Sequence, residues 1–156
     1  MSLKNWDEIT YLVKNLRKQN KKIVFTNGCF DIIHAGHVQY LQEAKALGDI
    51  LIIGLNSDAS VKRLKGAERP VNNQNDRAIV LSALKSVDYI VVFDEDTPYD
   101  LIKQIKPDIL VKGGDWPENK IVGHDIVKAN GGIVKSLSFR PGNSSTSIIE
   151  KMKNNG

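Results

Sequence analysis

Short apolar runs alternate with segments of helical periodicity along most of this chain, and that alternation constrains the fold more than any other feature. The apolar runs are rich in Ile, Val and Leu and continue without polar interruption. Such runs are typical of parallel strands, which are covered on both faces. The predicted strands cover residues 21–28, 49–58, 88–96, 108–116 and 133–139.

Helical periodicity fills the intervals between the predicted strands. A first helix is expected around Ile9–Leu16, and the others at 37–48, 75–87, 97–107, 121–129 and 143–152. The helix at 97–107 should begin with Thr97 as N-cap and Pro98 at its first helical position. For the helix at 75–87, the expected buried face consists of Ile79, Val80, Ala83, Leu84 and Val87.

Strands and helices in strict alternation predict an α/β fold with a five-stranded parallel sheet and helices on both faces. With 156 residues, the chain is expected to form one domain over 1–156. If the strand order is 3-2-1-4-5, the strands at 21–28 and 108–116 flank the point where that order reverses. Ligands of open parallel sheets bind at this point, beyond the carboxyl ends of the strands.

Composition narrows the classes of function that the chain can have. A single cysteine, Cys29, excludes an internal disulfide and fits a reducing cytoplasm. No segment has the length and apolar character of a signal peptide or a membrane helix. The net charge of +4 is spread along the chain, without the aromatic-interleaved basic stripe of RNA-binding sheets. We therefore expect a cytoplasmic location and no nucleic-acid or membrane partner.

The segment GCFDIIHAGH, residues 28–37, contains two of the three histidines. Gly28 ends a predicted strand and Gly36 stands at a helix start, where free N–H groups can hold an anion. The segment is neither the G-x-G-x-x-G dinucleotide fingerprint nor a P-loop. His34 and His37 lie three residues apart, so both side chains can face one side and donate to phosphate oxygens.

Metal binding is the rival interpretation of this segment. Asp31, His34 and His37 have the ligand types of a site with two histidines and one carboxylate. Three ligands crowded into seven residues across a loop and a helix start converge poorly, so phosphate binding is the preferred interpretation. A second feature near the expected site is the segment 62–75, which has no clear period and is rich in charge. We expect it to be a mobile loop that closes over a nucleotide and carries Lys65 inward.

GCFDIIHAGH resembles the G-x-F-D-x-x-H-x-G-H signature of the nucleotidyltransferase superfamily related to cytidylyltransferases. Residues 47–77 and 106–116 are similar to the adenylyltransferase domain of bacterial heptose enzymes, and 141–151 resembles the superfamily's S-T-T-x-I motif. The resemblance implies a Rossmann-like sheet of order 3-2-1-4-5, with a family core at 22–151 after an N-terminal helix at 1–21. It also implies a stand-alone adenylyltransferase, without the sugar kinase to which such domains are often fused.

The resemblance also implies roles for individual residues. His34 and His37 would contact the triphosphate, and Lys65 would meet an anionic reactant. The residues implied to line the nucleotide are Asn27, Gly28, Cys29, Phe30, Gly114 and Asp115. Those implied to hold the leaving phosphates are Ser144, Ser145 and Thr146. Lys112, at the end of a strand, either adds positive charge there or extends into solvent.

The activity implied is transfer of AMP from ATP to a sugar 1-phosphate, D-glycero-β-D-manno-heptose 1-phosphate, giving ADP-heptose and pyrophosphate. Mg²⁺ would enter bound to the substrate, with no metal site in the protein. A cytidylyltransferase acting on glycerol 3-phosphate is an alternative within the same class. A non-catalytic nucleotide-binding module is an alternative from another class. The expected partners are ATP and a sugar phosphate, and a homodimer is left open.

Overall fold

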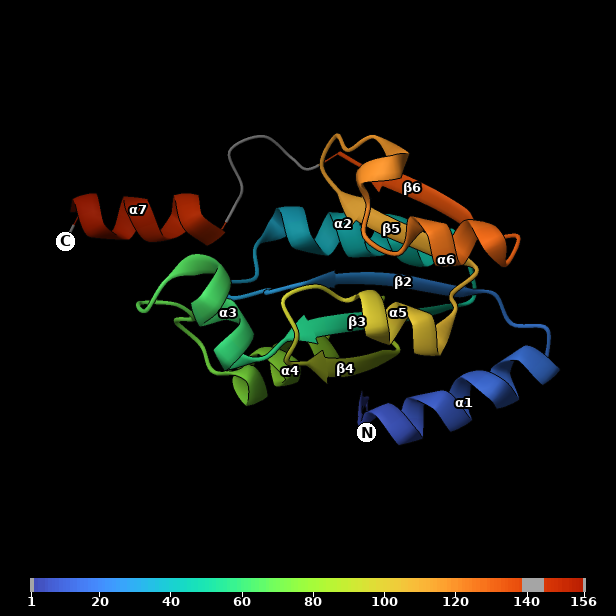
Figure 1. The fold of residues 1–156 in the computed structure, drawn as a ribbon. Helices are drawn as coiled ribbons and strands as arrows, with labels where there is room; N and C mark the ends of the chain where they lie inside the picture. The colour runs from blue at the N-terminus through green and yellow to red at the C-terminus, as the bar shows by residue number, and fades with distance from the viewer. Residues whose placement is uncertain (1, 139–144, 156) are drawn as a thin grey trace.

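A six-stranded parallel sheet forms the centre of the protein and carries helices on both faces (Figure 1). The computed structural model describes residues 2–138 and 145–155, without the side chains of 145–147 and 155. The strand order is β1-β4-β3-β2-β5-β6, and every neighbouring pair is parallel. In chain order the strands are β1 (Leu3–Lys4), β2 (Ile23–Gly28), β3 (Ile50–Asn56), β4 (Tyr89–Phe93), β5 (Ile109–Gly113) and β6 (Ile133–Leu137).

The prediction of a five-stranded sheet is wrong by one edge strand. The five expected strands are β2 to β6, which lie in the order β4-β3-β2-β5-β6, and β1 adds to the β4 edge. In β1, Leu3 is paired with Ile90, whose N–H donates to the carbonyl of Ser2 at 2.9 Å. A strand of two residues is too short to show a period of apolar side chains, so the sequence gives no sign of it.

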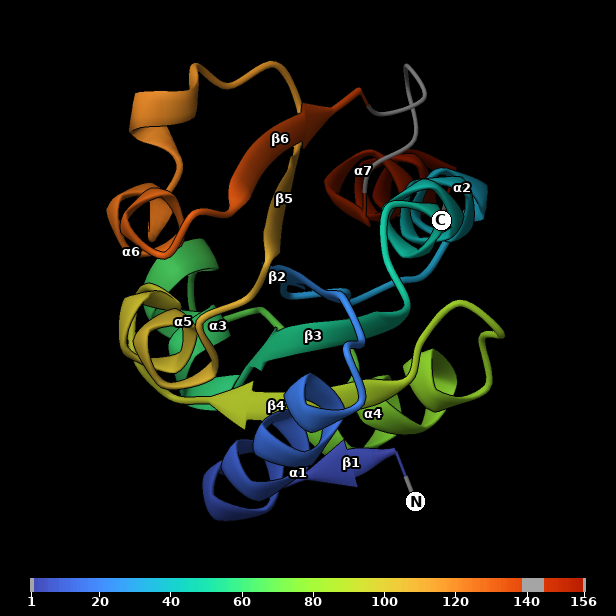
Figure 2. The same ribbon diagram turned by 90° about the vertical axis from the view of Figure 1, so that its right-hand side faces the viewer.

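Two groups of helices enclose the sheet (Figure 2). The helices are α1 (Trp6–Lys18), α2 (Ala35–Ala46), α3 (Asp58–Lys65), α4 (Gln74–Ser82), α5 (Tyr99–Ile105), the 3-10 helix η1 (Glu118–Lys120), α6 (His124–Ala129) and α7 (Ser145–Asn155). The α1, α5 and α6 helices pack against one face, and α2 and α4 pack against the other. The expected doubly wound α/β architecture is therefore confirmed. No helix among the described residues has the length and apolar character needed to cross a bilayer.

Strand β2 shows why both faces need cover. Its residues alternate between the two cores, with Phe25 packed in the core under α1 and α5 and Val24 in the core under α2 and α4. Both side chains are fully buried. A strand buried on both sides places its polar main-chain groups in the ladders with β3 and β5, leaving only its carboxyl end for chemistry.

The buried face of α4 differs from the prediction. Ile79 and Val80 are 65% and 46% exposed, whereas Arg77, Ala78 and Leu81 are buried. The helix ends at Ser82, so the expected period beyond that residue does not belong to it. A polar side chain, Arg77, takes part in the buried face, and apolar periodicity alone cannot detect such a case. The predicted N-cap of α5 is also wrong by one residue, because the cap is Pro98 rather than Thr97.

The point where the strand order reverses lies between β2 and β5. Going along the chain, β3 and β4 follow on one side of β2, and β5 and β6 on the other. The loops that leave β2 and β5 therefore emerge next to each other. The sequence predicts a site at these two loops, and the fold brings them to the same edge of the sheet.

Candidate active site

The turn after β2 is shaped by contact between Gly28 and Phe30. A Cβ atom added at Gly28 would lie 2.9 Å from the Phe30 ring, which no real side chain tolerates. Phe30 has a left-handed backbone, with φ of 46°, and its ring is 6% exposed. The ring therefore folds back over the strand end. Gly28 is required here for this close approach, since its own φ is not in the left-handed region.

His34 and His37 stand together at the start of α2. His34 is the N-cap residue and its main-chain N–H donates to Nδ1 of His37 at 3.3 Å. The two ring centroids are 3.8 Å apart, and the Phe30 ring lies 5.3 Å from that of His37. Both ring nitrogens of His34 are buried and have no hydrogen-bond partner among the described residues. Buried polar atoms without partners are costly unless a ligand satisfies them, so the pair is a candidate binding position.

Both histidines are held neutral. Burial lowers the pKa of His34. Burial, followed by the neighbouring His34 and Lys65, lowers the pKa of His37 to about 4. Since Nδ1 of His37 accepts a hydrogen bond, the proton of its neutral ring is assigned to Nε2. The pair thus offers N–H donors at the positive end of a helix, which suits phosphate oxygens.

Asp31 does not act as a metal ligand in this arrangement. Its carboxylate is fully buried and accepts hydrogen bonds from Arg69 Nε at 2.8 Å, the Val71 N–H at 2.8 Å and the Asn72 N–H at 2.9 Å. Its own carbonyl accepts from Asn72 Nδ2 at 2.8 Å. The rival metal site with the two histidines thereby loses its carboxylate. Among the described residues, no group of three or more histidine, cysteine or acidic side chains could hold a metal.

Asp31→Asn should make the free energy of unfolding less dependent on acid pH. Burial alone would raise the pKa of Asp31, but the Asn72 and Val71 amides and Arg69 outweigh it and hold the pKa below its usual value. Because the folded pKa is depressed, the stabilisation is complete above the unfolded pKa of about 3.9 and is lost as the pH falls through the folded pKa. Both carboxylate oxygens accept N–H donors, and asparagine keeps only one acceptor oxygen, so at least one donor loses its partner. The substitution should therefore cost about 1–3 kcal/mol at pH 7.

Urea unfolding of both proteins at pH 7 and between pH 3 and 5 measures this effect. Because the folded pKa of His37 is lowered, the free energy of unfolding also decreases as the pH falls from the ordinary histidine range toward about 4. This decrease occurs in the variant and the wild type alike, so only the difference between the two proteins reports on Asp31. A difference that stays constant down to pH 3 would contradict the carboxylate's role as an anchor.

Lys65 lies in a helix, not in the loop predicted for 62–75. The α3 helix continues to Lys65, and α4 already begins at Gln74, so only the middle of that segment is a loop. Gly66 caps α3 with φ of 102°. Lys65 itself is exposed, yet its positive charge acts to lower the pKa of both Cys29 and His37. The lysine is thus electrostatically linked to the turn and the histidine pair.

Cys29 is half-buried in the turn, and its environment does not activate it. Burial raises the pKa of the thiol, and the nearby Lys65, Arg77 and Arg69 compensate only in part. A thiol with a raised pKa is a poor nucleophile at neutral pH. This agrees with the interpretation of Cys29 as a small packing residue beside the nucleotide.

The loop after β5 forms the second side of the candidate site, opposite the turn after β2. Gly114 has φ of 99°, and its N–H donates to the carbonyl of Leu137 at 2.8 Å. The Lys112 ammonium lies 5.3 Å from the centre of the Trp116 ring, which is 48% exposed. Lys112 therefore lies over an aromatic face, and Asp115 is exposed beside it. The strand order reverses between β2 and β5. These residues lie at the end of β5 and in the loop after it, and Asn27 lies near the end of β2 on the other side of that point.

The hydroxyl-rich motif at 144–146 is only partly covered by the residues that the structure describes. Ser144 lies outside the described residues. Ser145 and Thr146 open α7, and only their main chain is described. Their contact with the leaving phosphates stays a prediction. Lys153, close to the C-terminal end of α7, has its Nζ 3.0 Å from the carboxylate of Glu68, so this end of the helix reaches the loop between α3 and α4.

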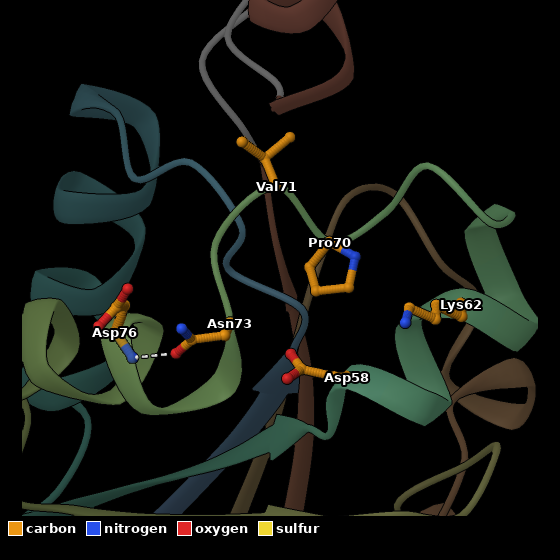
Figure 3. A pocket seen from close by; sticks show the side chains of 6 residues that line it. All are labelled: Asp58, Lys62, Pro70, Val71, Asn73 and Asp76. Atoms are coloured by element: carbon orange, nitrogen blue, oxygen red, sulfur yellow. Dashed lines mark hydrogen bonds between the residues drawn. The ribbon is translucent and has the colours of Figure 1, made fainter.

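An open pocket of about 280 Å³ lies between α3 and the start of α4 (Figure 3). Its lining consists of Asp58, Lys62, Pro70, Val71, Asn73 and Asp76. Two carboxylates against one lysine make it unfavourable for a triphosphate. The candidate nucleotide position is therefore the histidine side of the 69–72 segment, not this pocket.

Sequence reasoning missed the polar residues that support the site. Arg77, Arg69, Asn72 and Asp58 bind main-chain groups and carboxylates beneath the turn. The one available signal was the spacing of four residues between Arg77 and Leu81, which puts the two side chains on one face of a helix. An arginine there looks like a solvated residue until the fold shows what it contacts.

Known proteins resemble this chain closely. The bifunctional protein HldE of a Nitratiruptor species is 58% identical over 151 residues, which cover 97% of this chain and 32% of that protein. HldE of Wolinella succinogenes is 59% identical over 147 residues, covering 94% of this chain and 30% of that protein. This chain thus spans about a third of the length of these curated relatives.

Solved structures share the fold. A lipopolysaccharide core biosynthesis protein from Thermoplasma volcanium aligns with a TM-score of 0.61 and 29% identity, covering 77% of this chain and 97% of its own. Pantoate-beta-alanine ligase from Francisella tularensis has a TM-score of 0.65 at 16% identity, over 98% of this chain and 77% of its own. At that identity, the ligase shows likeness of fold alone.

The relatives and the family to which the chain belongs define a class: the chain is a nucleotidyltransferase. The sequence model of the cytidylyltransferase-like family matches residues 25–151. The chain belongs to this family, so the resemblance inferred from the signature is confirmed.

Proposed function

We propose that the protein transfers AMP from ATP to D-glycero-β-D-manno-heptose 1-phosphate, releasing pyrophosphate and forming ADP-heptose. The observation that carries the proposal is the pair of buried ring nitrogens of His34, which have no partner among the described residues, with the His37 ring centroid 3.8 Å away at a helix start. Such a position calls for an anion with several oxygens, as in a triphosphate. The sugar is proposed from the identity of 58% to an HldE protein.

In the proposed reaction, a phosphate oxygen of the sugar attacks the α-phosphorus of ATP. The bond to the bridging oxygen breaks, and pyrophosphate leaves with the electron pair. The attacking oxygen is already anionic at pH 7, so no strong base and no covalent enzyme intermediate are needed. The protein has to bring two polyanions together and stabilise charge as it develops on the phosphates.

The residues divide this work by position. Neutral His34 and His37 donate to phosphate oxygens, and Lys65 approaches from the end of α3. Thr146, with Ser144 and Ser145, binds the leaving pyrophosphate. The ribose and base lie against the turn after β2 and the loop after β5, including Gly114 and Asp115.

A panel of ATP, CTP, GTP and UTP against sugar phosphates tests the proposal through pyrophosphate release. Release should be fastest with ATP and the heptose 1-phosphate. Release with CTP and glycerol 3-phosphate alone would establish the alternative that the name of the cytidylyltransferase-like family favours. Nucleotide binding without release in any combination would establish a non-catalytic module. The cytoplasmic location and the single domain at 1–156 are further predictions.

We expect turnover to depend on added Mg²⁺ that enters with ATP. The Asp31 carboxylate is saturated by protein donors, so the ion has to be held mainly by the phosphates. Excess EDTA should abolish pyrophosphate release and added Mg²⁺ should restore it fully. Elemental analysis after dialysis should find no stoichiometric transition metal. Zinc or iron retained at one ion per chain would contradict this expectation.

A further inference from the structure

Arg77 is a completely buried arginine that makes four hydrogen bonds to the chain around the proposed nucleotide site. Its Nε donates to the Asn72 carbonyl at 2.9 Å, and its Nη1 donates to the carbonyls of Cys29 at 2.7 Å and Asn56 at 2.8 Å. Its Nη2 donates to the Asp58 carboxylate at 2.8 Å. We propose that Arg77 is a positioning residue, which fixes the turn after β2 in the shape that binds the nucleotide.

One guanidinium nitrogen joins the exits of two neighbouring strands. Cys29 follows the last residue of β2, and Asn56 is the last residue of β3. These strands are hydrogen-bonded to one another as far as Gly28 and Leu55. Beyond that pair the ladder ends, and Nη1 of Arg77 binds both carbonyls in its place. The arginine therefore sets the spacing of the two strands where they enter the site.

A second set of contacts fixes the other side of the same turn. Asn72 receives Arg77 Nε on its carbonyl and donates from its N–H and Nδ2 to Asp31. Arg77 thus binds Cys29 directly and reaches Asp31 through Asn72. Between these two points lies Phe30, with its left-handed φ of 46°. Anchors on both sides hold this unusual conformation, and the histidine pair follows it along the chain.

Lysine cannot reproduce this arrangement. The planar guanidinium sends donors in fixed directions to three carbonyls and one carboxylate, whereas an ammonium is a compact charge with three donors. Arg77→Lys therefore keeps the positive charge and removes the geometry. If Arg77 served only as a buried charge for Asp58, this substitution would leave the turn unchanged.

The inference rests on the proposed function, and the experiment compares Arg77→Lys with a matched control, Arg17→Lys. Arg17 also donates to two main-chain carbonyls, those of Ile105 and Lys106, and pairs with Asp108 at 3.5 Å. It joins α1 to the end of α5, away from the turn. The measurements are the Kd for ATP with Mg²⁺, KM and kcat for ATP, the melting temperature, and amide hydrogen exchange.

Arg77→Lys should raise Kd and KM for ATP roughly tenfold, about the effect of one lost hydrogen bond, with a smaller change in kcat. Exchange of the amides at 29–34 should become faster. Arg17→Lys should lower the melting temperature without changing KM or the exchange at 29–34. An Arg77→Lys variant that melts lower but keeps wild-type KM and exchange at 29–34 would overturn the inference.

Two further outcomes keep the inference separate from the proposed function. If Arg77→Lys does not fold, Asp58→Asn removes one anchor of the guanidinium and should still raise the KM for ATP about threefold. An unchanged KM in that variant overturns the inference. If the wild-type protein binds no nucleotide, the proposed function fails. In that case the exchange at 29–34 in Arg77→Lys or Asp58→Asn, set against Arg17→Lys, still decides whether Arg77 holds the turn.

Discussion

Alanine in place of His37 is expected to lower kcat for nucleotidyl transfer about 10²- to 10³-fold, the usual cost of losing one positioned donor to a developing oxyanion. Its ring centroid lies 3.8 Å from that of His34, at the start of α2. The assigned proton on Nε2 is then free to bind a phosphate oxygen. Because burial and its neighbours keep the pKa of His37 at about 4, the ring acts at pH 7 as a neutral donor in the free protein.

His34→Ala should have an effect of similar size, since its buried ring nitrogens have no partner among the described residues. Neither variant should melt far below the wild type. His34→Ala removes ring nitrogens that have no partner among the described residues, and His37→Ala leaves only the part-buried main-chain N–H of His34 without its acceptor, at a cost of about 1–3 kcal/mol. Steady-state kinetics and thermal melts of the same preparations measure both properties.

His124→Ala is the matched control. His124 is the remaining histidine, and its Nδ1 lies 2.9 Å from the Ile121 carbonyl at the start of α6. It should keep wild-type kcat. A His37→Ala protein that turns over normally would remove His37 from the mechanism. A protein that is unfolded at room temperature would show instead that the histidine is structural.

The sequence predicts well the parts of the fold that depend on long apolar patterns. The strands β2 to β6 are continuous apolar runs because α/β sheets are covered on both faces, and their alternation with helices limits the topology. The glycines and histidines of 28–37 then mark the exit of β2. The strand β1 could not be predicted, because Leu3–Lys4 is too short to show a pattern and becomes a strand only by pairing with β4, which is distant in sequence.

The sequence predicts poorly where a polar side chain is buried. In α4, Arg77 is on the inner face and Ile79 is exposed, the reverse of what hydrophobicity indicates. Asp31 was considered only in the rival metal interpretation, and its actual role, to anchor the 69–72 segment, was not predicted. In both cases the partners are main-chain groups distant in sequence, and no local spacing reveals them. The sequence could thus place the two candidate loops at one edge of the sheet, but it could not reveal the polar network beneath them.

Lys65→Ala is expected to lower kcat/KM about 10- to 150-fold, the effect of losing a hydrogen bond to a charged group, with no change in melting temperature. Lys65 is exposed at the end of α3, outside the core, yet its charge lowers the pKa of His37. A triphosphate bound to the histidines would lie within reach of the same charge. Lys62→Ala is the matched control, because Lys62 is one turn earlier on the same helix and lines the acidic pocket (Figure 3).

The structure also restricts which part of the 62–75 segment can close over the nucleotide. The segment from Arg69 to Asn72 is bound to Asp31, and Lys62 to Lys65 are helical. Movement is therefore expected at 66–68, where Gly66 has open space around it. Saturating ATP with Mg²⁺ should slow amide exchange at 66–68 and leave the protected amides at 71–72 unchanged. Unchanged exchange at 66–68, together with normal turnover of Lys65→Ala, would show that this segment is solvated surface and that Lys65 contacts neither reactant.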